Sequence, residues 1–128
     1  MGRVVRLRGS EDTANLIVHW ENSMLTHLLQ IASACYLMHN SSLEKRRRVQ
    51  QLTGYGRVKW QKLVAIGGNS HLRRDGIKQF LPLSYTLLYE LSSLHAVQIA
   101  TGIETGVIHR GASRASISAW RKSLGSYL

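Results

Sequence analysis

The sequence contains only one cysteine, one proline and one phenylalanine in 128 residues, and these shortages limit what the protein can be. Cys35 cannot form an internal disulfide, and we interpret it as a small buried side chain in an apolar helical segment, typical of a reducing compartment. Because proline interrupts helices, a chain with Pro82 alone can form long ones. No residues have the Cys-x2-Cys or His-x3-His spacing of a metal site, so we expect no metal or other cofactor.

Long hydrophobic runs and catalytic patterns are missing as well. The basic start, MGRVVRLRGS, is not followed by an apolar segment of signal-peptide length, and no stretch of about 18 uncharged apolar residues could span a membrane. No glycine sequence matches a phosphate-binding loop, and no spacing points to a Ser-His-Asp arrangement. We therefore expect a cytoplasmic protein with no enzymatic activity, no small-molecule substrate and no membrane partner.

Acidic residues are scarce, and this is the most informative shortage. The chain has 17 Lys and Arg against 7 Asp and Glu, which gives a formal charge of +10. Ten of the cations lie between Lys45 and Lys78 with one acid, Asp75, among them, whereas the first forty residues are nearly balanced. Such a surface attracts polyanions, and nucleic acid is the commonest of these. This distribution indicates a neutral N-terminal part that serves as a scaffold and a cationic remainder that binds the partner.

The hydrophobic pattern predicts an all-α fold in one domain, residues 1–128. Residues 1–10 form a basic arm or a short strand, and a long helix follows from about 11 to 38, with Ser10 as its N-cap. This helix is either continuous or broken near Asn22, and it is expected to provide both the core and a dimer contact. Its apolar stripe consists of Leu16, Ile17, Trp20, Met24, Leu25, Leu28, Ile31, Ala32, Cys35 and Met38.

Shorter helices are predicted for the rest of the chain. One covers SLEKRRRVQQLT, with Ser41 or Ser42 as its N-cap, and GYG at 54–56 forms the turn after it. The others run over about 57–66, ending at the Gly67-Gly68 pair, over 70–80, from Ser84 to Leu91, over 93–105, and from Ser113 to Leu124. Residues 57–124 contain the segment that carries the function.

The segment IKQFLPLSYTLLYEL has the spacing of a helix-turn-helix, with Pro82 in the turn and Ser84 capping the second helix. Two helices joined by such a turn leave the N-terminal end of the second helix protruding, where it can enter a major groove. We predict that the base-proximal side chains are Ser84, Tyr85, Thr86 and Tyr89. Glu90 either accepts from a cytosine amino group or is simply solvated. The apolar positions of the motif are Ile77, Leu81, Leu83, Leu87 or Leu88, and Leu91.

Basic residues around this motif are predicted to contact DNA phosphates. Arg73, Arg74 and Lys78 precede the turn, where the first helix of such a unit crosses the backbone. Lys59 and Lys62 lie one element further away. The predicted phosphate contacts also include Arg46 and Arg47, although their run, KRRR, could equally be a solvated helix face or an RNA-binding patch.

The residues Ile77, Leu81, Leu83, Ser84, Thr86, Leu87 and Leu91, followed by VQIATGIETGVIHRGASRA, resemble the helix-turn-helix region of ParB-type plasmid and phage DNA-binding proteins. The resemblance covers about residues 57–120. It implies that Ser84, Tyr85 and Thr86 lie near bases and that Arg114 contacts bases or backbone. The chain lacks that family's Gly-Glu-Arg-Arg nucleotide-binding box and a separate C-terminal dimerisation domain, so the resemblance implies DNA recognition without nucleotide hydrolysis.

A second stretch, GASRASISAWRKSL, repeats the pattern of a capping serine followed by an exposed first turn. It is either a second DNA-reading helix, with Arg114 as the contact, or a helix that packs back on the core with Arg121 and Lys122 solvated.

Together these patterns predict a sequence-specific double-stranded DNA-binding protein, a plasmid or phage transcriptional regulator that acts as a homodimer and associates with the nucleoid when bound. Two alternatives remain open: a small basic protein that inhibits an acidic host protein, and an RNA-binding protein.

Overall fold

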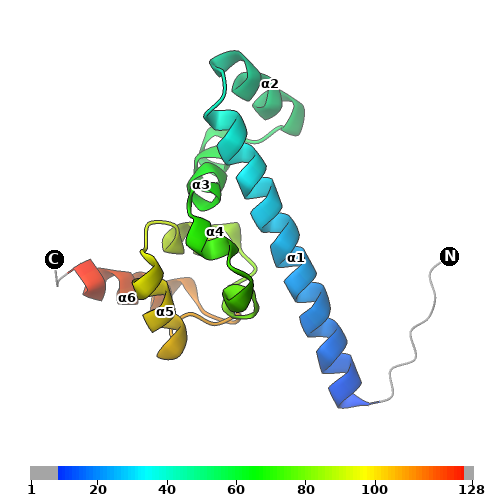
Figure 1. Ribbon diagram of the computed structural model, residues 1–128, viewed down its shortest axis with the longest axis vertical. Coiled ribbons are helices and arrows are strands. Elements are labelled where there is room, and N and C mark those ends of the chain that lie inside the picture. Colours follow the sequence, from blue (N-terminus) through cyan, green and yellow to red (C-terminus); the bar gives the residue numbers. More distant parts are fainter. Residues whose placement is uncertain (1–8, 126–128) are drawn as a thin grey trace.

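The computed structural model describes residues 9–125, and all regular secondary structure in that range is helical (Figure 1). This confirms the predicted all-α class. Residues 1–8 of the predicted basic arm lie outside the described residues. The elements are α1 (Ser10–His39), α2 (Leu43–Thr53), α3 (Arg57–Gly68), the short 3-10 helices η1 (Ser70–Arg73) and η2 (Asp75–Phe80), α4 (Tyr85–Leu91), α5 (Ala96–Glu104) and α6 (Arg114–Gly125).

Helix α1 is a single continuous helix of 30 residues, so the break considered near Asn22 does not occur. Its N-cap is Gly9, one residue before the predicted Ser10, and the Thr13 hydroxyl donates to the Gly9 carbonyl at 2.9 Å. Glu11 and Asp12 lie in the first turn, where carboxylates interact favourably with the helix dipole. The first half of α1 extends away from the other helices (Figure 1). No helix among the described residues combines the length and apolarity needed to cross a bilayer.

The predicted apolar stripe of α1 is only partly a core stripe. The buried residues of α1 are Leu25, Leu29, Ala32 and Cys35, all in its second half. The other helices pack against this half, so Ile17, Trp20, Met24 and Ile31 remain exposed by 41 to 60%. Periodicity identified an apolar face but not how much of it the rest of the chain would cover.

Helices α1 and α3 approach most closely at Gly67. A Cβ atom added there would lie 2.1 Å from the carbonyl oxygen of Ala32, and one at Gly68 would lie 2.9 Å from the Tyr36 ring. The two glycines are the last residues of α3, which ends at Gly68, and not the residues beyond its end as predicted. At the other end of the same crossing, the Trp60 indole donates to His39 Nδ1 at 3.1 Å.

The predicted helix over 70–80 is replaced by η1 and η2, which are separated by the extended backbone of Arg74. Asn69 explains the tight first turn: its side-chain oxygen accepts from the His71 N–H at 2.9 Å. Its amide group donates to the carbonyls of Ser92 and Leu94 at 2.8 and 3.1 Å. Asn69 is thus a buried polar residue whose hydrogen bonds join α3 to the turn after α4.

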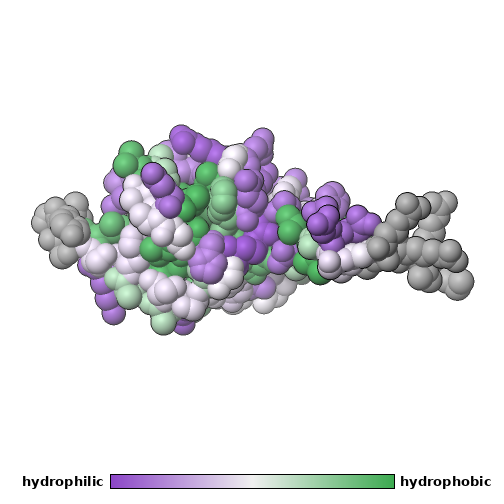
Figure 2. All heavy atoms as spheres, turned by 90° about the horizontal axis from the view of Figure 1, so that it is seen from below, coloured by the Kyte–Doolittle hydropathy of each residue, from purple (hydrophilic) through white to green (hydrophobic). Residues whose placement is uncertain are grey.

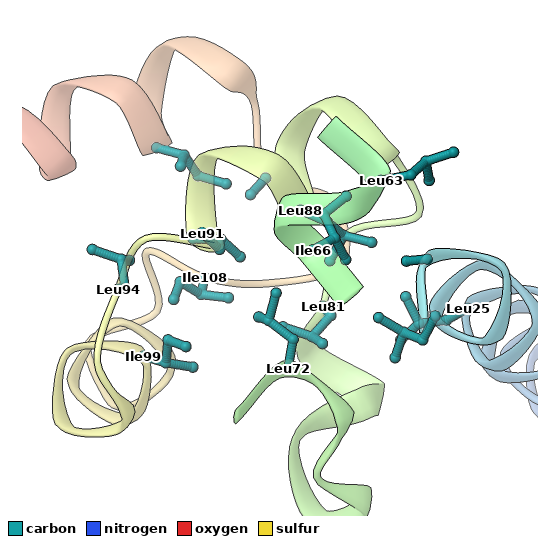
Figure 3. Close-up of a cluster of buried hydrophobic side chains, with 14 of the residues drawn as sticks. Leu25, Leu63, Ile66, Leu72, Leu81, Leu88, Leu91, Leu94, Ile99 and Ile108 are labelled. Carbon is teal, nitrogen blue, oxygen red and sulfur yellow. The ribbon is translucent and has the colours of Figure 1, made fainter. Parts of the chain in front are cut away.

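Leucine and isoleucine side chains from α1, α3, η1, α4 and α5 meet in one core (Figure 3). Pro82 is buried in it, with Leu81 at 0% exposure, so the corner of the predicted motif lies inside the protein. Helix α5 begins three residues later than predicted, at Ala96, and Gly106 with φ +82° follows its end, as expected for a terminating glycine.

Arg110 joins three distant parts of the chain. Its Nε donates to the Leu81 carbonyl at 2.6 Å, and its Nη2 donates to the Lys78 carbonyl at 2.7 Å and to Asn22 Oδ1 at 2.8 Å. Its Nη1 lies 3.8 Å from Glu21. The loop before α6 is therefore attached both to the proline corner and to α1.

Candidate functional site

Helix α4 begins where the sequence predicts it. The Ser84 hydroxyl accepts from the Leu87 N–H at 3.4 Å, which satisfies one of the free donors of the first turn. Leu88 and Leu91 are buried and anchor this seven-residue helix against the core. Its first turn lies beside α3.

Side chains from α3, the turn before it and α4 form a cluster that we call the Lys–Tyr patch, which consists of Tyr55, Lys59, Lys62, Tyr85 and Tyr89. Lys59 Nζ lies 4.5 Å from the centre of the Tyr55 ring and 5.6 Å from that of Tyr85. Lys62 Nζ lies 5.8 Å from the Tyr85 ring and 5.7 Å from the Tyr89 ring. These distances are within the range of cation–π attraction.

Helical spacing explains why these residues meet. Lys59 and Lys62 are three apart on α3, and Tyr85 and Tyr89 are four apart on α4, so each pair lies on one face of its helix. Neither lysine has a carboxylate within ion-pair distance among residues 9–125. Both ammonium groups therefore remain available to an external anion.

The predicted base-proximal residues are less exposed than the sequence suggests. Ser84, Tyr85 and Thr86 are half-buried, because Tyr85 packs against the edge of the core beneath the two lysines. Tyr89 is 41% exposed. Tyr89 is therefore the most accessible of the four predicted contacts.

Glu90 has neither of its two expected environments. It forms an ion pair with Arg121 at 2.6 Å, and Arg121 also donates to the Ser93 hydroxyl at 2.9 Å. Arg121 is therefore paired, although its side chain stays 36% exposed. The pair ties α6 to α4.

Two of the predicted phosphate contacts lie against α1. The Arg73 guanidinium donates to the Gly67 carbonyl at the end of α3, and Lys78 pairs with Asp75 at 3.2 Å. Both side chains line a groove of about 430 Å³ along α1 rather than the Lys–Tyr patch. The prediction assumed a regular helix over 70–80, and the change to η1 and η2 alters where these side chains lie. Arg74, which lies between η1 and η2 in the chain, is exposed.

Arg46 and Arg47 meet a third arginine that the sequence did not single out. Together with Arg57 they line a hollow of about 200 Å³ between α2 and α3. Helix α2 is capped by Ser42, which accepts from the Lys45 N–H at 3.1 Å, and buries none of its residues. Of the residues that the structure describes, no carboxylate lines this hollow to offset its positive charge.

Helix α6 packs back on the core, with Ile117 at 0% exposure. Ser113 caps it by accepting from the Ser116 N–H at 3.2 Å. Arg114, its first residue, is exposed. The packing of this stretch on the core is confirmed, and the DNA contact of Arg114 stays a prediction.

Sequence reasoning missed Tyr55 because it lies in the turn before α3, and its only signal was its spacing of four from Lys59. Among the described residues, no three or more His, Cys, Asp and Glu side chains are grouped as a metal site would require.

Comparison of the chain with protein-family models, curated proteins and solved structures finds no match.

Proposed function

We propose that this protein is a sequence-specific double-stranded DNA-binding protein of the helix-turn-helix type, a transcriptional regulator of a plasmid or phage that acts as a homodimer. In this proposal η2 and the corner at Pro82 precede α4, and α4 is the recognition helix. The protein binds operator DNA with the end of α4 that begins at Ser84.

The Lys–Tyr patch is the observation that carries the proposal. Two ammonium groups with no carboxylate partner among residues 9–125 lie near the ring of Tyr85 at the start of α4. Lysines in this position can contact phosphates on either side of a groove, and tyrosine hydroxyls can donate to phosphates or to base edges. A formal charge of +10 supplies the long-range attraction.

The individual roles follow from position on α3 and α4, and Tyr89 is also the most exposed of the four predicted base contacts on α4. Tyr89 and Thr86 are the residues assigned to base edges, and Lys59 and Lys62 are assigned to phosphates. The hollow lined by Arg46, Arg47 and Arg57 is a further phosphate site, reached if the duplex extends past α3.

The test is selection of bound duplexes from a random pool, followed by titration of the selected and a scrambled duplex. Tyr89→Ala should reduce the preference for the selected sequence by about 1 to 3 kcal/mol with little effect on the scrambled one. Lys62→Ala should weaken binding to both equally, and Lys62→Arg should restore it. Lys122→Ala removes an exposed charge from the end of α6 and serves as the matched control.

Failure to enrich any duplex sequence would overturn the proposal. Preference for RNA stem-loops over duplex DNA would favour the RNA-binding alternative. A stable complex with an acidic protein that DNA does not displace would favour the inhibitor alternative.

A further inference from the structure

Four of the seven large apolar residues that α1 exposes lie along one side of the helix, and the other three, Val18, Tyr36 and Leu37, lie elsewhere around it. Ile17, Met24 and Ile31 are spaced by seven, and Trp20 follows Ile17 by three. Their exposed fractions are 48, 60, 41 and 51% in the order Ile17, Met24, Ile31 and Trp20. At about 100° per residue they form one stripe, which lies beside the face that packs on α3. A seven-residue repeat is the pattern by which one helix packs along another.

Hydrophilic side chains surround the apolar stripe on the part of α1 that extends away from the other helices. In the space-filling view the narrow end of the described part of the molecule shows hydrophobic atoms among hydrophilic ones (Figure 2). Residues 17–24 of α1 contribute no side chain to the buried core. This half of the helix would gain most from a partner, because large apolar side chains are otherwise left in water.

The charge distribution favours a second copy of the chain as that partner. Helix α1 carries Glu11, Asp12 and Glu21 but no Lys or Arg, although the chain as a whole has a formal charge of +10. Two copies can thus approach along α1 without the repulsion that two cationic faces would produce. The four successive cations Lys45 to Arg48 begin a few residues past the C-terminal end of α1.

We infer that α1 of one copy packs antiparallel against α1 of a second copy, with Met24 at the two-fold axis. Ile17 is seven residues before Met24 and Ile31 is seven after it, so Ile17 of each copy lies level with Ile31 of the other. The same alignment brings Glu11 and Asp12 of each copy towards the end of the other helix that is followed by the basic α2. A parallel alignment would instead place like charges together at both ends.

The inference rests on the proposed function, because it names the arrangement of the homodimer proposed there. Ala32, where α3 crosses α1, would be level with residue 16 of the second copy, so the two bodies would be offset by about 24 Å along the paired helices. The two α4 helices would then lie towards opposite ends of the dimer.

The test is the solution mass of the full chain without DNA, by sedimentation equilibrium. We expect twice the monomer mass of 14.4 kDa. Met24→Lys should weaken the dimer by about tenfold or more, since it places two charges together at the axis. Leu37→Lys is the control: Leu37 is 70% exposed but lies about 140° around α1 from Met24, and its substitution should leave the mass unchanged. Circular dichroism checks that both variants remain helical.

A second measurement tests the orientation. In a Cys35→Ala background, Ile17→Cys mixed with Ile31→Cys should form a disulfide between the two variants under mild oxidation, whereas each alone should not. Self-crosslinking of Ile17→Cys would overturn the antiparallel arrangement. A monomeric mass at high protein concentration would overturn the inference, and vesicle-dependent Trp fluorescence of that monomer would assign the stripe to a lipid surface.

The outcomes separate this inference from the proposed function. A dimer that enriches no duplex would contradict DNA binding alone. A monomer that binds its selected duplex would contradict the dimer alone.

Discussion

Arg110 is a structural residue that charge counting would assign to DNA. Its side chain is only 16% exposed, and it donates to the carbonyls of Leu81 and Lys78 and to Asn22. We expect Arg110→Ala to lower the free energy of unfolding by about 2 to 4 kcal/mol, because these acceptors lose a charged donor.

Urea denaturation measures this effect. Arg110→Lys should recover only part of the loss, since a single ammonium group cannot donate along all the directions that the guanidinium uses. Arg114→Ala, at an exposed position, should change the stability by less than about 0.5 kcal/mol. Equal stabilities for Arg110→Ala and Arg114→Ala would contradict the role given to Arg110.

Because of Cys35, the free energy of unfolding should depend on pH in the alkaline range. Burial raises the pKa of its thiol above the ordinary value of 9.0, and nearby Lys59 opposes this only in part. The folded protein therefore holds the thiol proton more tightly than the unfolded chain does. The resulting stabilisation is complete below pH 9.0 and is lost as the pH rises through the folded-state pKa.

The corresponding measurement compares urea stability of the wild type and Cys35→Ala from pH 7 to pH 10. The difference between the two should stay constant up to about pH 8 and then shrink. A difference that stays constant over the whole range would show that burial does not perturb the thiol.

At the scale of elements, the crossing of α1 and α3 tolerates no side chain at Gly67. The methyl group of alanine would overlap the Ala32 carbonyl, which is backbone and cannot rotate away. We expect Gly67→Ala to destabilise the protein by about 3 kcal/mol or more in thermal or urea unfolding. Gly76→Ala, where no atom lies within 4 Å of the added Cβ, is the matched control and should change little.

Elements with strong local signals were predictable. The helical period of α1 and the serine caps of α2 and α4 are local signals, and the structure has a continuous α1, selects Ser42 from the two predicted caps of α2 and confirms Ser84 as the cap of α4. The segment over 70–80 was not predictable in this way. Its 3-10 turns depend on hydrogen bonds of Asn69 to Ser92 and Leu94, which are more than twenty residues away.

The candidate site was predictable in composition but not in geometry. Charge patterning selected Lys59 and Lys62, and the cap at Ser84 selected α4, yet only the packing of α3 on α4 brings these lysines over Tyr85. The same packing half-buries Tyr85. Arg73 and Lys78 were selected by the same charge pattern but lie in the groove along α1, because the backbone between them is not a regular helix.

For the molecule as a whole, the charge predicts a steep dependence of DNA affinity on salt. Each phosphate contact contributes about −0.9 to the slope of log K against log salt concentration. Replacing Lys59 and Lys62 together by Ala should reduce the magnitude of this slope by about 2, whereas Lys122→Ala should leave it unchanged. Titrations at several salt concentrations measure the slope, and equal slopes for all three proteins would remove the lysines from the interface.

The attachment of Arg110 to Asn22 spans 88 positions of the chain, and this separation has a consequence for biosynthesis. Helices α1 and α3 can pair once α3 has been synthesised, but the bonds that join α1, the proline corner and the loop before α6 form only after Arg110 has been synthesised. Long-range closures of this kind are slow steps in folding. We therefore expect chains that stop before residue 110 to be far more sensitive to protease than a chain of residues 1–128.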